Sequence, residues 1–108
     1  MGYLTTHVLD TAQGQPARQI RIDLYRLEGQ QPMMLHSVIT NDDGRCDGPL
    51  LAGEDFKPGS YQLVFYAGNY FKDAGQVLPE IPFLDEVVIR FGISAADEHY
   101  HVPLLLSP

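Results

Sequence analysis

Apolar and polar side chains alternate along much of the chain, in short runs separated by turn-forming residues. In residues 20–28, Ile20, Ile22 and Leu24 occupy alternate positions, with polar or aromatic residues between them. A period of two is typical of a strand that turns one face toward the core. Similar runs predict further strands at residues 3–10, 33–40, 45–50, 60–67, 84–93 and 98–106.

Turn-forming residues close most of these runs. Residues 41–44, Asn-Asp-Asp-Gly, and residues 57–59, Lys-Pro-Gly, are strong turn signals. Residues 69–77 are the one segment with a helical pattern, with Asn69 as its candidate cap. Connections this short favour antiparallel neighbours. We therefore predict an all-β fold, a sandwich or a barrel of seven mostly antiparallel strands with one short helix, in a single domain spanning residues 1–108.

Charge narrows the range of partners. The chain has 14 acidic and 7 basic residues, a formal net charge of −7, and no cluster of Lys or Arg. Nucleic acids and anionic membranes are bound by basic patches, so we expect neither as a partner. The single cysteine, Cys46, excludes an intrachain disulfide and fits a reducing compartment. The N-terminus has no secretory pattern. A cytoplasmic location is expected, with periplasm and peroxisome left open.

Two histidines stand out in the last predicted strand. His99 and His101 are two residues apart, so they share one face of the sheet. The opposite face is the better core face, with Tyr100, Val102, Leu104 and Leu106. The histidines therefore line solvent, a cleft or a subunit contact. A His-x-His pair resembles half of a zinc site, but no cysteine or carboxylate has ligand spacing beside it, and no metal is predicted.

His7 and Arg45 are the other candidates for chemistry. His7 lies in the first strand, on the face opposite Leu4 and Val8, and a role for it requires that two strands present histidines to one cleft. Arg45 follows the turn at residues 41–44. Beside two imidazoles, its guanidinium could bind a planar anion or stabilise an oxyanion. The alternative for Arg45 is a surface salt bridge with Asp42, Asp43 or Asp47.

Cys46 has neither a histidine nor a second cysteine near it in the sequence. A nucleophilic role stays open for it. We expect instead a small, buried or half-buried residue.

Three segments of the chain resemble the transthyretin-related proteins. They are Thr-Thr-His-Val-Leu-Asp at residues 5–10, followed by Gly14 and Pro16-Ala17; Thr-Asn-Asp-Asp-Gly-Arg at residues 40–45; and His-Tyr-His-Val-Pro-Leu-Leu-Leu-Ser-Pro at residues 99–108. They occur in the family's order and span the chain, and the last is the most specific. The family has a hormone-carrying branch, with Lys, Glu and Thr where this chain has His7, Arg45 and His101. These three positions match the hydrolase branch.

The resemblance implies a transthyretin-like antiparallel β-sandwich and hydrolysis of 5-hydroxyisourate in urate degradation. In that reaction water attacks a ring carbonyl and a cyclic amide C–N bond breaks. The implied catalytic residues are His7, Arg45 and His101, which bind the purine-derived substrate together with His99. No metal or organic cofactor is implied. The implied assembly is a homotetramer, a dimer of dimers, with active sites in the channel between the dimers.

The resemblance leaves other points open. It does not decide which histidine is the general base. The family continues beyond the Ser-Pro of residues 107–108 to a Tyr-Arg-Gly-Ser segment, and we expect this chain to lack that segment. A non-catalytic carrier that uses the same channel is the alternative function. A surface adhesion domain would need an export signal, neighbouring domains or Lys–Asn crosslink spacing, and none is visible.

Overall fold

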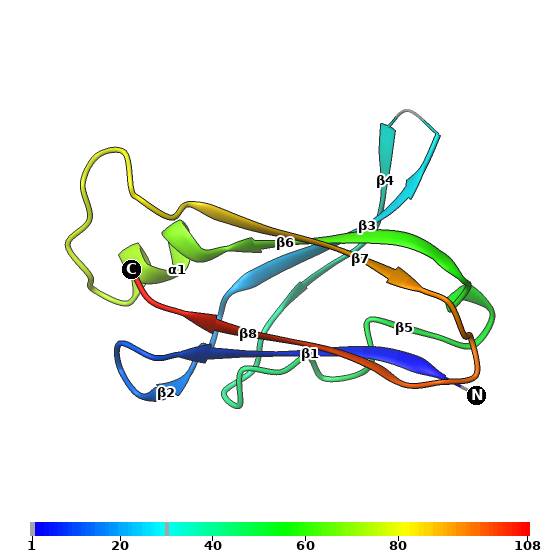
Figure 1. Cartoon of the computed structure of the whole chain (residues 1–108). Helices are drawn as coiled ribbons and strands as arrows, with labels where there is room; N and C mark the ends of the chain where they lie inside the picture. Colours follow the sequence, from blue (N-terminus) through cyan, green and yellow to red (C-terminus); the bar gives the residue numbers. More distant parts are fainter. Residues whose placement is uncertain (1, 30) are drawn as a thin grey trace.

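The computed structural model describes residues 2–29 and 31–108. In these residues two four-stranded sheets pack face to face, with a short helix at one end of the sandwich (Figure 1). The elements are β1 (Tyr3–Asp10), β2 (Gln15–Pro16), β3 (Arg21–Glu28), β4 (Gln31–Ile39), β5 (Leu51–Ala52), a 3-10 turn (Gly53–Asp55), β6 (Gly59–Tyr66), α1 (Ala67–Asp73), β7 (Glu86–Ile93) and β8 (Tyr100–Leu106). The predicted all-β sandwich with one short α-helix is confirmed.

The first sheet is built around β1. Along one edge β1 pairs in parallel with β8, from Leu4 opposite Tyr100 to Asp10 opposite Leu106. Its other edge pairs in the antiparallel sense with β2 and β5. The two ends of the chain therefore meet in one sheet. The parallel pair departs from the mostly antiparallel pattern, since it joins strands at opposite ends of the sequence.

The second sheet has the order β4-β3-β6-β7, and all its neighbours are antiparallel. A bulge between Leu24 and Tyr25 shifts the register of β3 against β4. The core lies between the two sheets, where alternate positions of the strands are buried, among them Leu4 and Val8 of β1 and Ile22 and Leu24 of β3. Burial of each such aliphatic side chain contributes roughly 1.5–3 kcal/mol.

Two buried carboxylates complete the packing. Asp10 accepts hydrogen bonds from the backbone N–H groups of Ala12 and Gln13 and from the hydroxyl of Tyr70. Asp23 lies on the face of β3 opposite Ile22 and Leu24, where it bonds to Arg21 two residues earlier, yet its side chain is fully buried. Burial alone would raise the pKa of Asp23, but hydrogen bonds from Ser37, Arg21 and Tyr66 outweigh it and lower that pKa.

Several predicted boundaries are wrong. The segment at residues 45–50 forms a single bridge at Arg45 rather than a strand, and β5 follows it. The helix starts at Ala67, two residues before its predicted start, and Asn69 lies inside it rather than at its cap. It ends at Asp73, ahead of the predicted limit, and Gly75 follows with a φ of +88°. In the described part of the chain, no helix is both long and apolar enough to span a membrane.

Candidate active site

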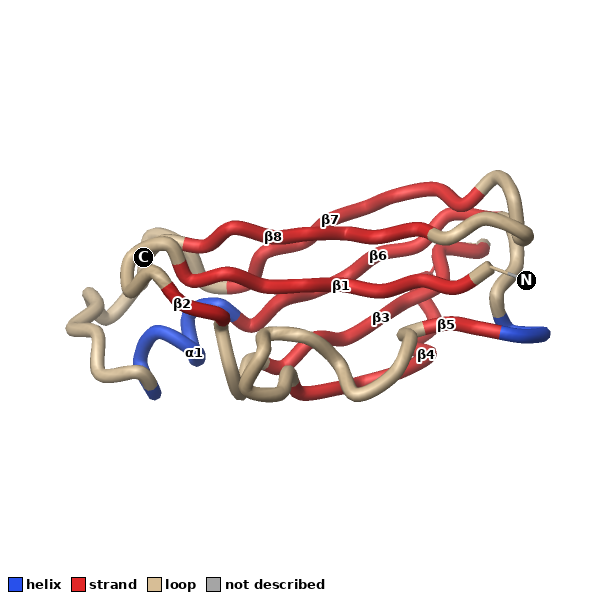
Figure 2. Tube along the Cα trace, turned by 90° about the horizontal axis from the view of Figure 1, so that it is seen from below, coloured by secondary structure: helices blue, strands red, loops and turns tan. Residues whose placement is uncertain are grey.

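The parallel pairing of β1 with β8 brings the predicted histidines onto one surface. Thr5 lies opposite His101, and His7 lies opposite Pro103 two positions further along. Both views show the two strands running side by side along one layer of the sandwich (Figure 2). Leu4, Thr6 and Val8 are buried on the other face of β1, as predicted. His7 and His101 therefore share the outer face of this sheet.

A tight turn places Arg45 beside His7. The backbone of Arg45 forms an isolated antiparallel bridge with His7, on the edge of β1 opposite β8. The side-chain oxygen of Asn41 accepts hydrogen bonds from the backbone N–H groups of Asp43 and Arg45. Gly44 has a φ of +73°, a conformation that favours glycine. The turn predicted from residues 41–44 thus fixes the backbone from which Arg45 extends.

The imidazoles of His7 and His101 each have one hydrogen-bond partner, and that bond determines which ring nitrogen is left free. Nε2 of His7 lies 3.1 Å from the carbonyl oxygen of Asp43. A carbonyl can only accept, so Nε2 is the protonated nitrogen, and Nδ1 of a neutral His7 keeps its lone pair. Nδ1 of His101 lies 2.8 Å from Oγ1 of Thr5. In His101 it is therefore Nε2 that this bond leaves free.

The electrostatic environment favours the neutral form of His101. Partial burial of the ring is the largest cause that lowers its pKa, followed by the charges of Arg45 and His7. A positive neighbour disfavours a second positive charge. Arg45 and His7 thus both act electrostatically on His101. The ion pairs among residues 2–29 and 31–108 are Arg21–Asp23 and Arg26–Glu28, so the alternative of a salt bridge at Arg45 is not formed there.

A cavity of about 450 Å³ adjoins this group. Its lining consists of Tyr3, Thr5, Thr6, Arg45, Cys46, Gly48 and Pro49. The volume lies within the usual range for sites that bind small molecules. Cys46 is half-buried, as expected, and burial followed by the charge of Asp47 raises its pKa. The thiol is therefore held in its neutral, weakly nucleophilic form.

His99 stands at one end of this surface. It is exposed, and its ring centroid lies 3.9 Å from that of Tyr3, with the two planes tilted by 34°. The ring of His99 thus packs against Tyr3 of β1. Neither Tyr3 nor Thr5 was a sequence candidate. The parallel pairing of β1 with β8 would have indicated Thr5, because it sets Thr5 opposite His101.

The profile of the HIUase/Transthyretin family matches residues 4–108 of this chain. The chain belongs to this family. The 5-hydroxyisourate hydrolase of Pseudomonas aeruginosa is 63% identical over 108 residues, which cover 100% of this chain and 86% of the relative. The expectation about a C-terminal segment stays a prediction.

Solved structures of family relatives agree with the fold. A Klebsiella pneumoniae 5-hydroxyisourate hydrolase superposes with a TM-score of 0.81 at 31% identity, over 100% of this chain and 91% of the other. An (S)-allantoin synthase structure gives a TM-score of 0.91 at 46% identity, over 97% of this chain. The match spans 40% of the synthase chain, so it concerns one part of that protein. These neighbours support the transthyretin-like arrangement of the two sheets.

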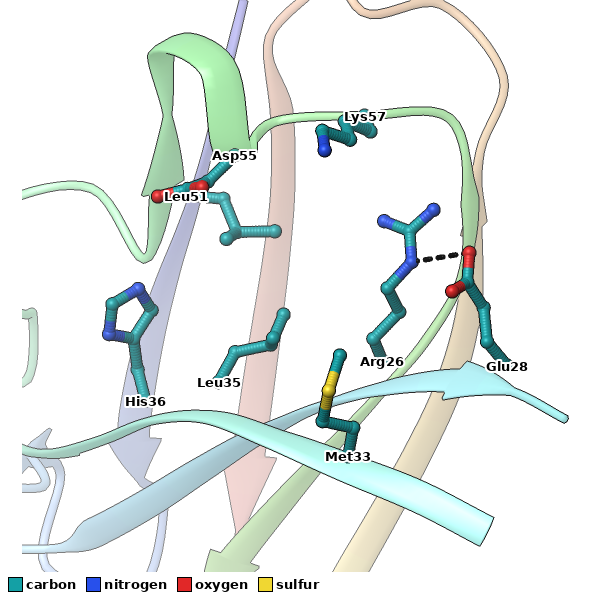
Figure 3. A pocket seen from close by; sticks show the side chains of 8 residues that line it. All are labelled: Arg26, Glu28, Met33, Leu35, His36, Leu51, Asp55 and Lys57. Carbon is teal, nitrogen blue, oxygen red and sulfur yellow. Dashed lines mark ion pairs between the residues drawn. The ribbon is translucent and has the colours of Figure 1, made fainter. Parts of the chain in front are cut away.

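A second pocket, of about 340 Å³, is lined by residues of β3, β4 and the segment 51–57, and none of the predicted site residues lines it (Figure 3). Arg26 is its best anion-binding candidate. Its guanidinium, however, pairs with Glu28 at 2.7 Å and donates to the Tyr61 hydroxyl and the Pro58 carbonyl. Arg26 is thus engaged by the protein itself, and the surface of β1 and β8 remains the better candidate site.

Proposed function

We infer that this protein hydrolyses 5-hydroxyisourate, the substrate named for its relatives in Pseudomonas aeruginosa and Klebsiella pneumoniae. The observation that carries the proposal is the meeting of His7, Arg45 and His101 on one open face of the first sheet. This arrangement offers a neutral base and a fixed cation to a planar substrate with several carbonyl oxygens. Both are needed when water attacks a carbonyl and negative charge develops on its oxygen.

In the proposed mechanism, His101 is the general base. Nε2 of His101 takes a proton from water as the water oxygen bonds to the ring carbonyl carbon. The C–N bond then breaks, and the imidazolium of His101 returns the proton to the leaving nitrogen. A base whose pKa is kept low stays neutral and ready to accept this proton near neutral pH. General-base assistance of this kind accelerates a reaction by roughly 10²–10⁴-fold.

The other residues hold the reactants. The Nδ1 lone pair of His7 accepts a hydrogen bond from the attacking water, since Nε2 is used by the carbonyl of Asp43. Arg45 binds the substrate oxygens and stabilises the developing negative charge. His99, whose ring packs against Tyr3, contacts the substrate at the end of the site. No step needs a metal or an organic cofactor.

The proposed assembly is a homotetramer, a dimer of dimers, in which the histidine-bearing faces line a channel between the dimers. The open position of this face supports it, because Leu105 on the same face of β8 is 65% exposed. A sheet face that the chain itself leaves uncovered is available to a second subunit. Analytical ultracentrifugation tests the proposal, since a mass near one chain at micromolar concentration would contradict it.

The activity is tested with 5-hydroxyisourate made in place by urate oxidase and followed by its ultraviolet absorbance. The substrate decays on its own, so a reaction without the protein gives the background. We expect faster decay with the protein and background decay with His101→Ala. Tight binding of a planar ligand without turnover would instead support the carrier function. Wild-type turnover by His101→Ala would overturn the assignment of the base.

A further inference from the structure

Thr5 and His101 form a hydrogen bond across the two strands that carry the site. Oγ1 of Thr5 lies 2.8 Å from Nδ1 of His101. We propose that Thr5 is a positioning residue, which accepts the Nδ1–H of His101 and thereby presents the lone pair on Nε2 to the attacking water. This rests on the proposed function, in which His101 is the base.

The backbone holds Thr5 at this place. Thr5 and His101 are direct partners in the parallel register of β1 and β8. Oγ1 is two bonds from Cα, and a β-branched side chain has few rotamers, so the oxygen moves little. The hydroxyls of Thr6 and Thr11 also reach β8, but they donate to the backbone carbonyls of Val102 and Leu106. Of these three threonine hydroxyls, that of Thr5 meets a side chain of β8 and the other two meet its backbone.

The direction of the bond follows from the chemistry of a base. A hydroxyl can donate to Nδ1 or accept from it. If it donated, Nε2 of the neutral ring would carry the proton and could not take one from water. If it accepts, Nε2 has the lone pair, and the bond persists when the ring becomes an imidazolium, which has only N–H donors. Only the second direction serves His101 both before and after it takes the proton.

A hydroxyl also suits the charges around His101. The charged groups that act on this ring are Arg45, across β1, and His7 of β1. His99 lies two residues earlier on the same chain segment as His101. A carboxylate in place of Thr5 would orient the ring but would stabilise the imidazolium and raise its pKa. Thr5 fixes the orientation and tautomer without adding a charge. The site therefore keeps a base that is both oriented and neutral.

The test compares Thr5→Val, Thr5→Ser and Thr11→Val. Valine keeps the shape of threonine and the preference for a strand, so the hydroxyl is the main loss. We expect Thr5→Val to lower kcat roughly 10- to 100-fold, as part of the 10²–10⁴-fold that a general base contributes, with little change in KM. Thr5→Ser restores most of the rate. Thr11→Val removes a hydroxyl that also bonds to β8 but touches no ring, and its kcat stays at the wild-type value.

Two further readouts separate positioning from a structural role. Loss of the acceptor destabilises the imidazolium more than the neutral ring, so the acid limb of the kcat/KM profile of Thr5→Val moves to lower pH. Nitrogen-15 NMR of His101 at neutral pH shows Nδ1 protonated in the wild type and a loss of that preference in Thr5→Val. An acid limb that moves to higher pH, or a protonated Nε2 in the wild type, overturns the proposal.

The outcomes for Thr5 and for the proposed function are distinct. Wild-type kcat in Thr5→Val together with an inactive His101→Ala overturns the role of Thr5 and leaves His101 as the base. Failure of Thr5→Ser to recover the rate also overturns it, because serine retains the hydroxyl. Wild-type turnover by His101→Ala overturns the proposed function itself, whatever the Thr5 variants do.

Discussion

Gly44 lies directly against the backbone of Val8. A Cβ at position 44 would collide with the carbonyl oxygen of Val8, and the backbone N–H of Val8 donates to the carbonyl of Gly44 at 2.9 Å. This close approach joins the turn at residues 41–44 to β1, next to His7 and Arg45. The position of Arg45, the arginine of the proposed mechanism, therefore depends on a glycine that has no side chain to take part in the chemistry.

Gly44→Ala is expected to destabilise the protein and to lower its activity. The φ of +73° costs an alanine about 1–2 kcal/mol, and the collision with Val8 adds to this. Gly14→Ala is the matched control, because Gly14 has a φ of +66° and no heavy atom within 4 Å of the added Cβ. Urea unfolding measures both. Equal losses in the two variants would show that the contact with Val8 has no cost of its own.

Tyr70→Phe is expected to reduce stability by about 1–3 kcal/mol, since it leaves one oxygen of the buried Asp10 without its hydroxyl partner. Burial, followed by the hydrogen bond to Asp10, raises the pKa of Tyr70 to about 12, so the hydroxyl is protonated and donates under ordinary conditions. The free energy of unfolding in urea is the measurement. Tyr25→Phe, a change in a half-buried tyrosine of β3, serves as control. An unchanged stability of Tyr70→Phe would rule out a net contribution from the bond.

The sequence predicts the faces of the strands better than their partners. Alternation correctly placed His7 and His101 away from the core, because the side-chain direction follows from local geometry. It did not predict that β1 and β8 pair in parallel, since such a pairing depends on contacts between opposite ends of the chain. Thr5 was missed for that reason. Alternation did not indicate that Asp23 is buried, because Ser37 and Tyr66, which donate to its carboxylate, come from the neighbouring strands β4 and β6.

Cys46→Ala is expected to keep the turnover of the wild type within about two-fold, because surface or half-buried changes without a lost contact have small effects. The thiol lines the cavity beside Arg45, but burial and Asp47 raise its pKa, so its thiolate is scarce at neutral pH. The decay of 5-hydroxyisourate gives the rate, with His101→Ala as the inactive control. A loss comparable to that of His101→Ala would instead assign a nucleophilic role to the thiol.

Activity is expected to persist below pH 6.5, the ordinary pKa of a histidine, because burial, Arg45 and His7 lower the pKa of His101. The free energy of unfolding depends on pH for the same reason. Between the folded and the ordinary pKa the unfolded chain binds more protons at His101, so this residue's contribution to stability is present above pH 6.5 and is lost as the pH falls toward the folded pKa.

Arg45→Gln removes one positive neighbour of His101, and the acid limb of kcat/KM then moves to higher pH while the maximal rate falls. Arg90→Gln is the charge-matched control on β7, where the side chain bonds to Gln62 and is not among the charges that act on His101. An acid limb that stays in place in Arg45→Gln would show that the arginine does not act on the base, and its part would then be confined to holding the substrate.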